Sequence, residues 1–159
     1  MEDMNTAKTF KTDCLGLDAT YKFGEQIGAR LRGGEVFELI GDLGSGKTAL
    51  VRGVARALGV EDEVTSPSFT INNIYRSKKL SIYHYDFYRL TEAGVVENEL
   101  IESMDNHDSV TFIEWGTSVE NILPVNKVVV TCSTTGEDTR HFECSYQHEQ
   151  SYLFEGIEQ

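Results

Sequence analysis

The chain is predicted to fold as an α/β protein of three layers, with a mixed sheet that has a parallel core and antiparallel additions, and with helices on both faces. Two observations predict this fold class. The first is a strand, a glycine-rich loop and a helix in direct succession over residues 36–58. The second is the order of the other elements, in which helices alternate with strands through the middle of the chain and two hairpins accompany them.

The segment before this unit is predicted to hold a weak strand at residues 9–12 and then a helix. Asp18 is a candidate N-cap for that helix, which is expected to end near Gly33 and Gly34. Apolar residues one helical turn apart would form its buried face: Phe23, Ile27 and Leu31. The central unit follows, with a strand over residues 36–40 and a helix over residues 47–58 that Gly59 can terminate.

The second half of the chain is predicted to contain two hairpins, a helix and one buried strand. Residues 69–75 and 80–86 are rich in β-branched and aromatic residues and are predicted to form a β-hairpin. A helix is expected near residues 92–104, a buried strand at 110–114, and a second hairpin formed by 128–133 and 140–146. The length of 159 residues indicates one domain over residues 1–159, with its core at about 9–146. The tail at 147–159 is either a docked short helix or a frayed end.

The glycine-rich loop has the complete pattern G-x-x-x-x-G-K-[ST], from Gly41 to Thr48. Its glycines permit backbone conformations in which successive N–H groups converge on one anion. Lys47 adds a mobile positive charge for the β- and γ-phosphates, and the Thr48 hydroxyl is placed to ligate Mg²⁺. The helix that begins near Lys47 points its positive end at the same phosphates. The pattern therefore predicts a P-loop NTPase-like fold that binds a nucleoside triphosphate with Mg²⁺.

Two acids are predicted to join this loop because each ends a strand. Asp86 ends the strand at 80–86, and Glu114 ends the strand at 110–114. Ligands of parallel sheets bind beyond the carboxyl ends of the strands, so both carboxylates are expected at the edge where the phosphates lie. Lys47, Asp86 and Glu114 are the predicted catalytic groups, and Thr48, Asp86 and Glu114 the predicted Mg²⁺ ligands. Taken singly, Asp86 could instead form a turn and Glu114 could be a solvated strand end.

Other residues are candidates on weaker grounds. Thr65 and Ser66 precede a strand where a loop would pass near the γ-phosphate, although Pro67 alone could explain a turn there. Two interpretations of Trp115 stay open: it packs in the core, or it contacts the nucleotide or a partner. Two also stay open for Arg140, which either reaches a phosphate or has a surface role. His84 is interpreted as a packed or hydrogen-bonded core residue. The full set of predicted nucleotide contacts is Asp42, Leu43, Gly44, Ser45, Gly46, Lys47, Thr48, Ala49, Thr65, Ser66, Trp115 and Arg140.

Composition restricts the partners and the compartment. The net charge is −12, so tight independent binding of nucleic acid is disfavoured, and in an RNA pathway a partner protein is expected to hold the RNA. No apolar run is long enough to cross a membrane, and the N-terminus lacks a signal peptide, which favours the cytoplasm. The cysteines (Cys14, Cys132, Cys144) are expected to be reduced and packed, and they do not suggest zinc.

Four motifs together resemble the TsaE family, which acts in bacterial tRNA threonylcarbamoyladenosine biosynthesis. They occur in order as Gly41–Thr48 followed by Arg52-Gly53, then Ser-Pro-Ser-Phe-Thr at 66–70, His-Tyr-Asp-Phe-Tyr-Arg-Leu at 84–90, and Ile-Glu-Trp at 113–115. The resemblance covers roughly residues 10–145. The chain departs from the family at two positions. Ala49 stands where the family usually has a second hydroxyl residue, and Ser68 stands where it usually has threonine.

The resemblance implies a cytoplasmic ATPase that binds the TsaD and TsaB proteins and drives repeated threonylcarbamoyl transfer to tRNA without performing the transfer itself. It implies an activity that is weak alone and rises on assembly. It also implies that Lys47 binds phosphate, that Thr48 and Glu114 meet Mg²⁺, and that Asp86 occupies the Walker-B-like position. It further implies that residues 66–67 mark a switch-like loop, that Trp115 lies near the nucleotide, that the helix start at 17–20 lies near the base, and that Arg140 matches an arginine of the last hairpin.

Two other functions fit a phosphate loop of this size. One is a binding module in which ATP occupancy controls assembly and hydrolysis is incidental. The other is a small-molecule or nucleoside kinase, which is disfavoured because the segment between Leu90 and Val110 is acidic and lacks an Arg-rich lid.

Overall fold

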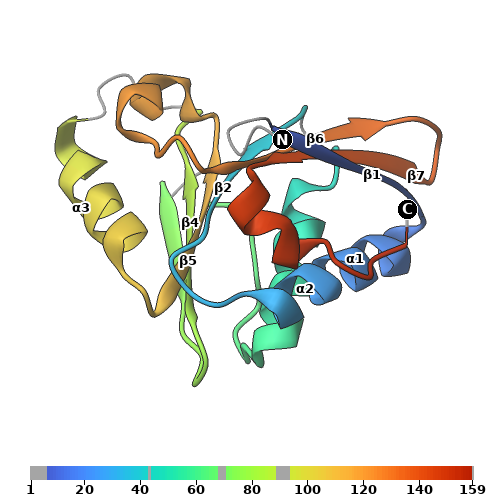
Figure 1. Cartoon of the computed structure of the whole chain (residues 1–159), viewed down its shortest axis with the longest axis horizontal. Helices are drawn as coiled ribbons and strands as arrows, with labels where there is room; N and C mark the ends of the chain where they lie inside the picture. The colour runs from blue at the N-terminus through green and yellow to red at the C-terminus, as the bar shows by residue number, and fades with distance from the viewer. Residues whose placement is uncertain (1–6, 43, 68–70, 89–93, 159) are drawn as a thin grey trace.

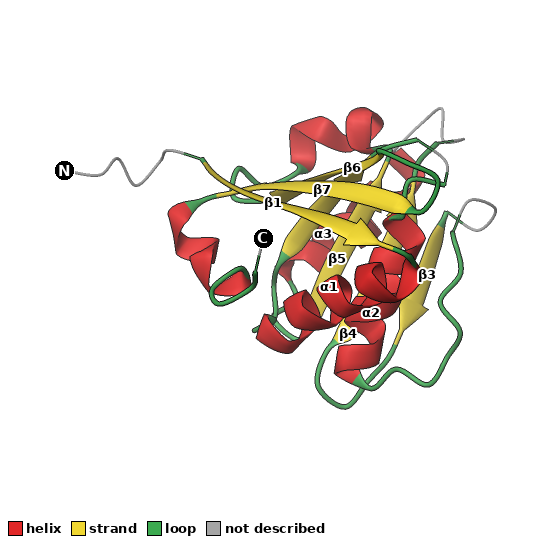
Figure 2. Ribbon diagram, turned by 90° about the vertical axis from the view of Figure 1, so that its right-hand side faces the viewer, coloured by secondary structure: helices red, strands yellow, loops and turns green. Residues whose placement is uncertain are grey.

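A mixed sheet organises the fold, with its strands in the order β1-β7-β6-β2-β5-β4-β3 (Figures 1 and 2). The computed structural model describes residues 7–42, 44–67, 71–88 and 94–158, and seven strands form the sheet in this part of the chain. The strands are β1 (Lys8–Leu15), β2 (Val36–Ile40), β3 (Asn72–Tyr75), β4 (Ser81–Asp86), β5 (Ser109–Glu114), β6 (Val128–Thr134) and β7 (Thr139–Tyr146).

The sheet has a parallel centre and antiparallel margins, as the sequence predicts. β2 pairs in parallel with both β5 and β6, and β4 pairs in parallel with β5. The pairs β3–β4, β6–β7 and β1–β7 are antiparallel. Both predicted hairpins are therefore confirmed. Since β2, β5 and β4 run in the same direction, their carboxyl ends reach one edge of the sheet.

Helices cover both faces of the sheet (Figure 1). On one face lie α1 (Leu17–Arg30) and α2 (Lys47–Leu58), and on the other lies α3 (Gly94–Asp105). Two hydrophobic clusters match this division. The larger cluster joins α1 and α2 to the sheet through Phe23, Ile27, Leu50, Val54 and Phe142. The smaller cluster joins α3 to it through Leu100, Tyr85 and Ile113. The burial of these apolar side chains supplies the main force that holds the layers together.

The two helices on the first face approach each other closely at glycines. A Cβ added at Gly24 would lie 2.4 Å from the Leu50 carbonyl oxygen, and one at Gly53 would lie 2.3 Å from that of Tyr21. Larger residues would force the helices apart. This close approach sets the N-terminal turn of α1 beside that of α2, where the phosphate loop ends.

Several boundaries differ from the sequence predictions. Asp18 is not the N-cap of α1, because the helix begins at Leu17 and Gly16 is its cap residue. The Gly16 N–H donates to the Asp138 carbonyl oxygen at 2.8 Å, so a long-range contact fixes this helix start. The helix also ends at Arg30, earlier than expected. The predicted strand at 69–75 is a strand only from Asn72, and residues 68–70 lie outside the described part of the chain, as do residues 92–93 of the expected helix.

The C-terminal segment docks on the domain instead of fraying. It forms a 3₁₀ helix, η2 (His148–Leu153), and Leu153, Phe154 and Ile157 are buried with the α1–α2 cluster. A second 3₁₀ helix that the sequence did not indicate, η1 (Gly116–Ile122), follows β5. All three cysteines are free and buried, as predicted. No helix within the described ranges is long and apolar enough to span a bilayer.

Candidate nucleotide site

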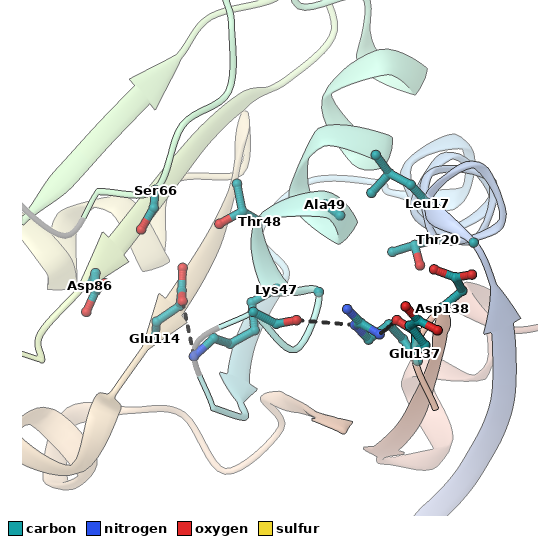
Figure 3. A pocket seen from close by; sticks show the side chains of 14 residues that line it. Leu17, Thr20, Lys47, Thr48, Ala49, Ser66, Asp86, Glu114, Glu137 and Asp138 are labelled. Atoms are coloured by element: carbon teal, nitrogen blue, oxygen red, sulfur yellow. Dashed lines mark hydrogen bonds and ion pairs between the residues drawn. The ribbon is translucent and has the colours of Figure 1, made fainter. Parts of the chain in front are cut away.

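A cavity of about 430 Å³ opens at the carboxyl ends of the parallel strands. Figure 3 shows Thr48, Ser66, Asp86 and Glu114 on one side of Lys47, and Leu17, Thr20, Glu137 and Asp138 on the other. The cavity is lined by Gly16, Leu17, Thr20, Gly44, Gly46, Lys47, Thr48, Ala49, Ser66, Asp86, Glu114, Glu137, Asp138 and Arg140. Residues from α1, the phosphate loop, β4, β5 and the β6–β7 turn therefore share one space.

The phosphate loop runs from β2 into α2 through glycines that larger residues cannot replace. Gly44 and Gly46 have φ angles of 79° and 109°, a region that residues with a Cβ rarely adopt. A Cβ at Gly41 would lie 2.5 Å from the Cys132 carbonyl oxygen. Gly46 caps α2, so the unpaired N–H groups of the first helical turn lie beside the cavity. This is the arrangement that binds phosphate groups at helix N-termini.

Lys47 is nearly buried and its ammonium group has three neighbours. Its Nζ donates to the Gly41 carbonyl oxygen, lies 3.5 Å from Glu114 Oε1, and lies 4.9 Å from the centre of the Trp115 ring. Only 6% of the residue is exposed. The lysine sits at the first turn of α2 and its side chain is flexible, so it can turn toward an anion in the cavity.

Glu114 receives a second contact from the neighbouring strand. His84 Nε2 lies 2.5 Å from Glu114 Oε2, and the exposed fractions of the two residues are 0% and 3%. Burial raises the pKa of the Glu114 carboxyl, but the hydrogen bond and charge of His84 and the charge of Lys47 outweigh it, so the pKa lies below its ordinary value. The carboxylate is therefore ionised at neutral pH, which is the form that binds a cation or accepts a hydrogen bond from water.

Glu114 and Asp86 are neighbours because their strands are in register. Leu39 of β2 pairs with Glu114 of β5, which pairs with Asp86 of β4. Asp86 is also buried, and its Oδ1 accepts the Tyr88 N–H at 2.9 Å. Its place on the cavity wall follows from the parallel pairing of β4 with β5.

The donors on this wall fit a hard divalent cation. Thr48, Asp86 and Glu114 offer a hydroxyl and two carboxylates, which are oxygen ligands of the kind that Mg²⁺ prefers. Among the described residues, no group of three His, Cys, Asp or Glu side chains is arranged to hold a metal. A cation at this wall would therefore need phosphate oxygens to complete its shell, as nucleotide-bound Mg²⁺ does.

The opposite end of the cavity is built by long-range pairing. β1 pairs with β7 so that Cys14 faces Arg140, and the Gly16–Asp138 hydrogen bond closes this end. Arg140 Nε donates to the Gly44 carbonyl oxygen at 3.2 Å. The arginine thus connects the last hairpin to the phosphate loop.

Among the described residues, the other predicted contacts do not line the cavity. Asp42 is exposed and Ser45 is buried, whereas Leu43 lies outside the described residues. Thr65 is hydrogen-bonded to β3, because its N–H donates to the Tyr75 hydroxyl at 3.0 Å. Trp115 has a left-handed backbone with φ of 56°, is 37% exposed, and contacts Tyr88 with ring centres 5.0 Å apart.

Sequence reasoning overlooked two polar groups near the site and the partner of a third. Glu137 and Asp138 line the cavity, although the sequence only suggested a turn there. The prediction that His84 is a packed or hydrogen-bonded core residue is confirmed, because it is fully buried and hydrogen-bonded, but the sequence did not indicate that its partner is Glu114. Its position two residues before Asp86, on a strand that ends at the site, is a signal that could have indicated this contact.

Comparison with known proteins agrees with this geometry. The family profile described as "Threonylcarbamoyl adenosine biosynthesis protein TsaE" matches residues 16–142. This chain belongs to the TsaE family. The matched region contains the phosphate loop, both carboxylates and Arg140, so every wall of the cavity falls within it.

Individual TsaE proteins are similar over most of the chain. Each of three relatives is named tRNA threonylcarbamoyladenosine biosynthesis protein TsaE. The relative from Treponema pallidum is 34% identical over 76% of this chain and 89% of its own length. The relative from Bacillus subtilis is 31% identical over 84% of this chain and 83% of its own length. The relative from Synechocystis is 41% identical over 62% of this chain, but the match spans only 65% of its length.

A solved structure shares the fold. The crystal structure of YdiB from Bacillus subtilis superposes with a TM-score of 0.76 at 26% identity and covers 93% of both chains. An experimental structure of similar sequence thus has the same overall fold as this chain. The TsaE family is a P-loop family of tRNA modification, and this chain has its fold.

Proposed function

We propose that this chain is a Mg²⁺-dependent ATP hydrolase of tRNA threonylcarbamoyladenosine biosynthesis that works in the cytoplasm in complex with the TsaD and TsaB proteins. The observation that carries the proposal is the convergence of Lys47, Asp86 and Glu114 on one cavity at the start of α2. Membership in the TsaE family supports the pathway. The net charge of −12 supports a role in which partners, not this chain, hold the tRNA.

The residues of the cavity have distinct roles in this proposal. The amides of the phosphate loop and Lys47 bind the phosphates, and Arg140 supports the loop from the other side. Thr48 and Asp86 would hold Mg²⁺ together with phosphate oxygens, and Glu114 would complete that shell or orient the attacking water. Bound Mg²⁺ supplies neutralisation of the charge on the phosphates.

Nucleotide binding also changes the surroundings of Glu114 in this scheme. When Lys47 turns from Glu114 toward a phosphate, the carboxylate loses its cation partner. Glu114 Oε1 is then free to accept a hydrogen bond from water, whereas Oε2 remains on His84. The proton of the attacking water can pass to Oε1, which makes Glu114 the general base.

ATP turnover in the presence and absence of TsaD and TsaB tests the proposal. We expect slow turnover by the chain alone, faster turnover with both partners, and loss of at least about 100-fold for Lys47→Ala because a principal phosphate contact is removed. Lys127→Ala is the matched control. Lys127 is also a largely buried lysine in ion pairs, with Glu38 and Glu120, but it does not line the cavity. Equal, negligible turnover of wild type and Lys47→Ala with both partners would contradict the proposal.

Glu114→Gln separates hydrolysis from nucleotide-gated assembly. The amide keeps the shape of the side chain but cannot act as a base. We expect this variant to bind ATP and the partners and to fail in repeated rounds of tRNA modification. If the variant does not hydrolyse ATP but still supports full tRNA modification, the alternative function is favoured, in which ATP binding controls assembly and hydrolysis is incidental.

A further inference from the structure

His84 is a polar residue in a position where an apolar one would be less costly. It lies in β4 with none of its surface exposed, and on the same face of the strand Ile82 belongs to the core whereas Asp86 lines the cavity. Its Nδ1 has no hydrogen-bond partner among the described residues, so its one polar contact there is with Glu114. A buried imidazole with one unpaired nitrogen is unfavourable for stability, which points to a role for the other nitrogen.

The two oxygens of Glu114 have partners of different kinds. Oε2 is 2.5 Å from His84 Nε2, and Oε1 is 3.5 Å from Lys47 Nζ. His84 belongs to a strand held on both sides, since it pairs with Asn73 of β3 and Phe112 of β5. The histidine therefore stays in place when the flexible lysine moves. One carboxylate oxygen has a fixed donor, and the other faces the cavity with a partner that can leave.

We propose that His84 is a positioning residue, which holds Glu114 Oε2 so that Oε1 keeps facing the nucleotide after Lys47 has turned to the phosphates. This inference rests on the proposed function, in which Glu114 acts on ATP. Without His84, the ionised carboxylate would rotate about its side-chain bonds or follow Lys47, because Oε2 has no other hydrogen-bond partner among the described residues. His84 acts through Glu114 and does not line the cavity itself.

Two amide variants test the proposal by moving the donor along the side chain. His84→Gln places an N–H donor at about the reach of Nε2, whereas His84→Asn reaches only about as far as Nδ1. Both bury an amide at the same place, so their difference reports the donor position. We expect His84→Asn to lower ATP turnover about 10-fold or more, as loss of an orienting partner does, with the ATP dissociation constant changed less than about 2-fold. His84→Gln should restore most of the turnover.

A double variant and a packing control complete the experiment. If His84 works through Glu114, His84→Asn should cause no further loss in a Glu114→Gln background. Ile82→Val trims a buried side chain on the same face of β4 without touching Glu114 and should leave turnover unchanged. Unchanged turnover of His84→Asn would overturn the inference, as would equal losses in the Gln and Asn variants or a further loss in the double variant.

The crystal structure of His84→Asn provides a readout that needs no turnover. The inference requires the Glu114 carboxylate to leave its present orientation in that variant and to keep it in His84→Gln. An unchanged Glu114 in His84→Asn would overturn the inference even if the chain hydrolyses ATP. Wild-type protein that binds ATP but never hydrolyses it with both partners would instead contradict the proposed function. The two failures are therefore distinguishable.

Discussion

Two buried glutamates at opposite ends of the parallel strands differ in the donors that hold them. Glu35 precedes β2 at the amino end and is 6% exposed, whereas Glu114 ends β5 at the carboxyl end and is 3% exposed. Glu35 Oε1 accepts the Gly33 N–H at 2.7 Å, and its Oε2 accepts the Arg32 N–H at 2.8 Å and the Tyr152 hydroxyl at 2.6 Å. Glu114 has one short contact with His84 and a longer one with Lys47.

The difference separates a structural carboxylate from a functional one. Two of the three donors to Glu35 are backbone groups of the turn that leads into β2, and the third ties η2 to that turn. None of them can leave without unfolding part of the chain. Glu114 keeps one oxygen toward a cavity and toward a lysine whose alternative partner is an anion. Burial alone is therefore a poor guide to function, and the mobility of the partners is a better one.

Glu114→Gln should have the largest functional effect and a small structural one. We expect turnover to fall about 100- to 1,000-fold, because a general base or electrostatic group is removed. The free energy of unfolding should change little, since the amide can still accept the hydrogen bond from His84. Steady-state turnover and denaturant unfolding measure the two effects. A variant that is strongly destabilised would show that Glu114 is a structural group like Glu35.

Glu35→Ala should show the reverse behaviour. It leaves two backbone N–H groups and the Tyr152 hydroxyl without their acceptor, which should lower the free energy of unfolding by about 2–4 kcal/mol. Turnover per folded molecule should stay the same, because Glu35 does not line the nucleotide cavity. Urea unfolding and turnover at a temperature where the variant is folded give the two values. A loss of ATP turnover in the folded variant would contradict the distinction between Glu35 as a structural carboxylate and Glu114 as a functional one.

Much of the fold and of the cavity wall could be predicted because their signals are local. The phosphate loop has a fixed spacing, and Asp86 and Glu114 end two strands whose composition marks them as buried. Parallel pairing then brings those strand ends to one edge. The structure places them there, with Asp86 and Glu114 as register partners.

The rest depends on contacts that no local pattern contains. The turn that carries Glu137 and Asp138 reaches the cavity only because β1 pairs with β7 over the whole length of both strands. Gly16 replaces Asp18 as the cap of α1 for the same reason, because its N–H finds the Asp138 carbonyl oxygen. η1 has only two apolar residues one turn apart (Val119 and Ile122), too few to mark a helix, and its start follows the left-handed turn at Trp115. Such features are set by tertiary structure, which overrides local propensity.

Tyr152→Phe should give a smaller change that depends on pH. Burial and the neighbouring Glu35 raise the pKa of the Tyr152 hydroxyl, so the folded chain holds this proton more tightly than the unfolded chain. The resulting stability is present below the ordinary tyrosine pKa of about 10 and is lost as the pH rises above it. We expect a loss of about 1–2 kcal/mol at pH 7 and a shallower alkaline decline than in wild type. Unfolding free energies measured from pH 7 to 11 test this. An unchanged alkaline slope would show that Tyr152 does not hold its proton for Glu35.

Trp115→Leu should produce the smallest effect, and its sign is informative. The Trp115 ring lies 4.9 Å from Lys47 Nζ, and a cation–π contact of this kind contributes about 0.5–1 kcal/mol. Because the ring holds Lys47 away from the phosphates, its removal should raise the affinity for ATP by about 2- to 5-fold. Calorimetric titration measures the change, with Tyr88→Leu as control, since the Tyr88 ring contacts Trp115 and, in the described part of the chain, Lys47 has no contact with it. A fall in affinity would mean that the ring contacts the nucleotide. Lys47 would then be held by Gly41 and Glu114 alone, and the Lys47–Glu114 pair would be a more permanent contact. In that case Glu114 would resemble Glu35, whose partners do not leave.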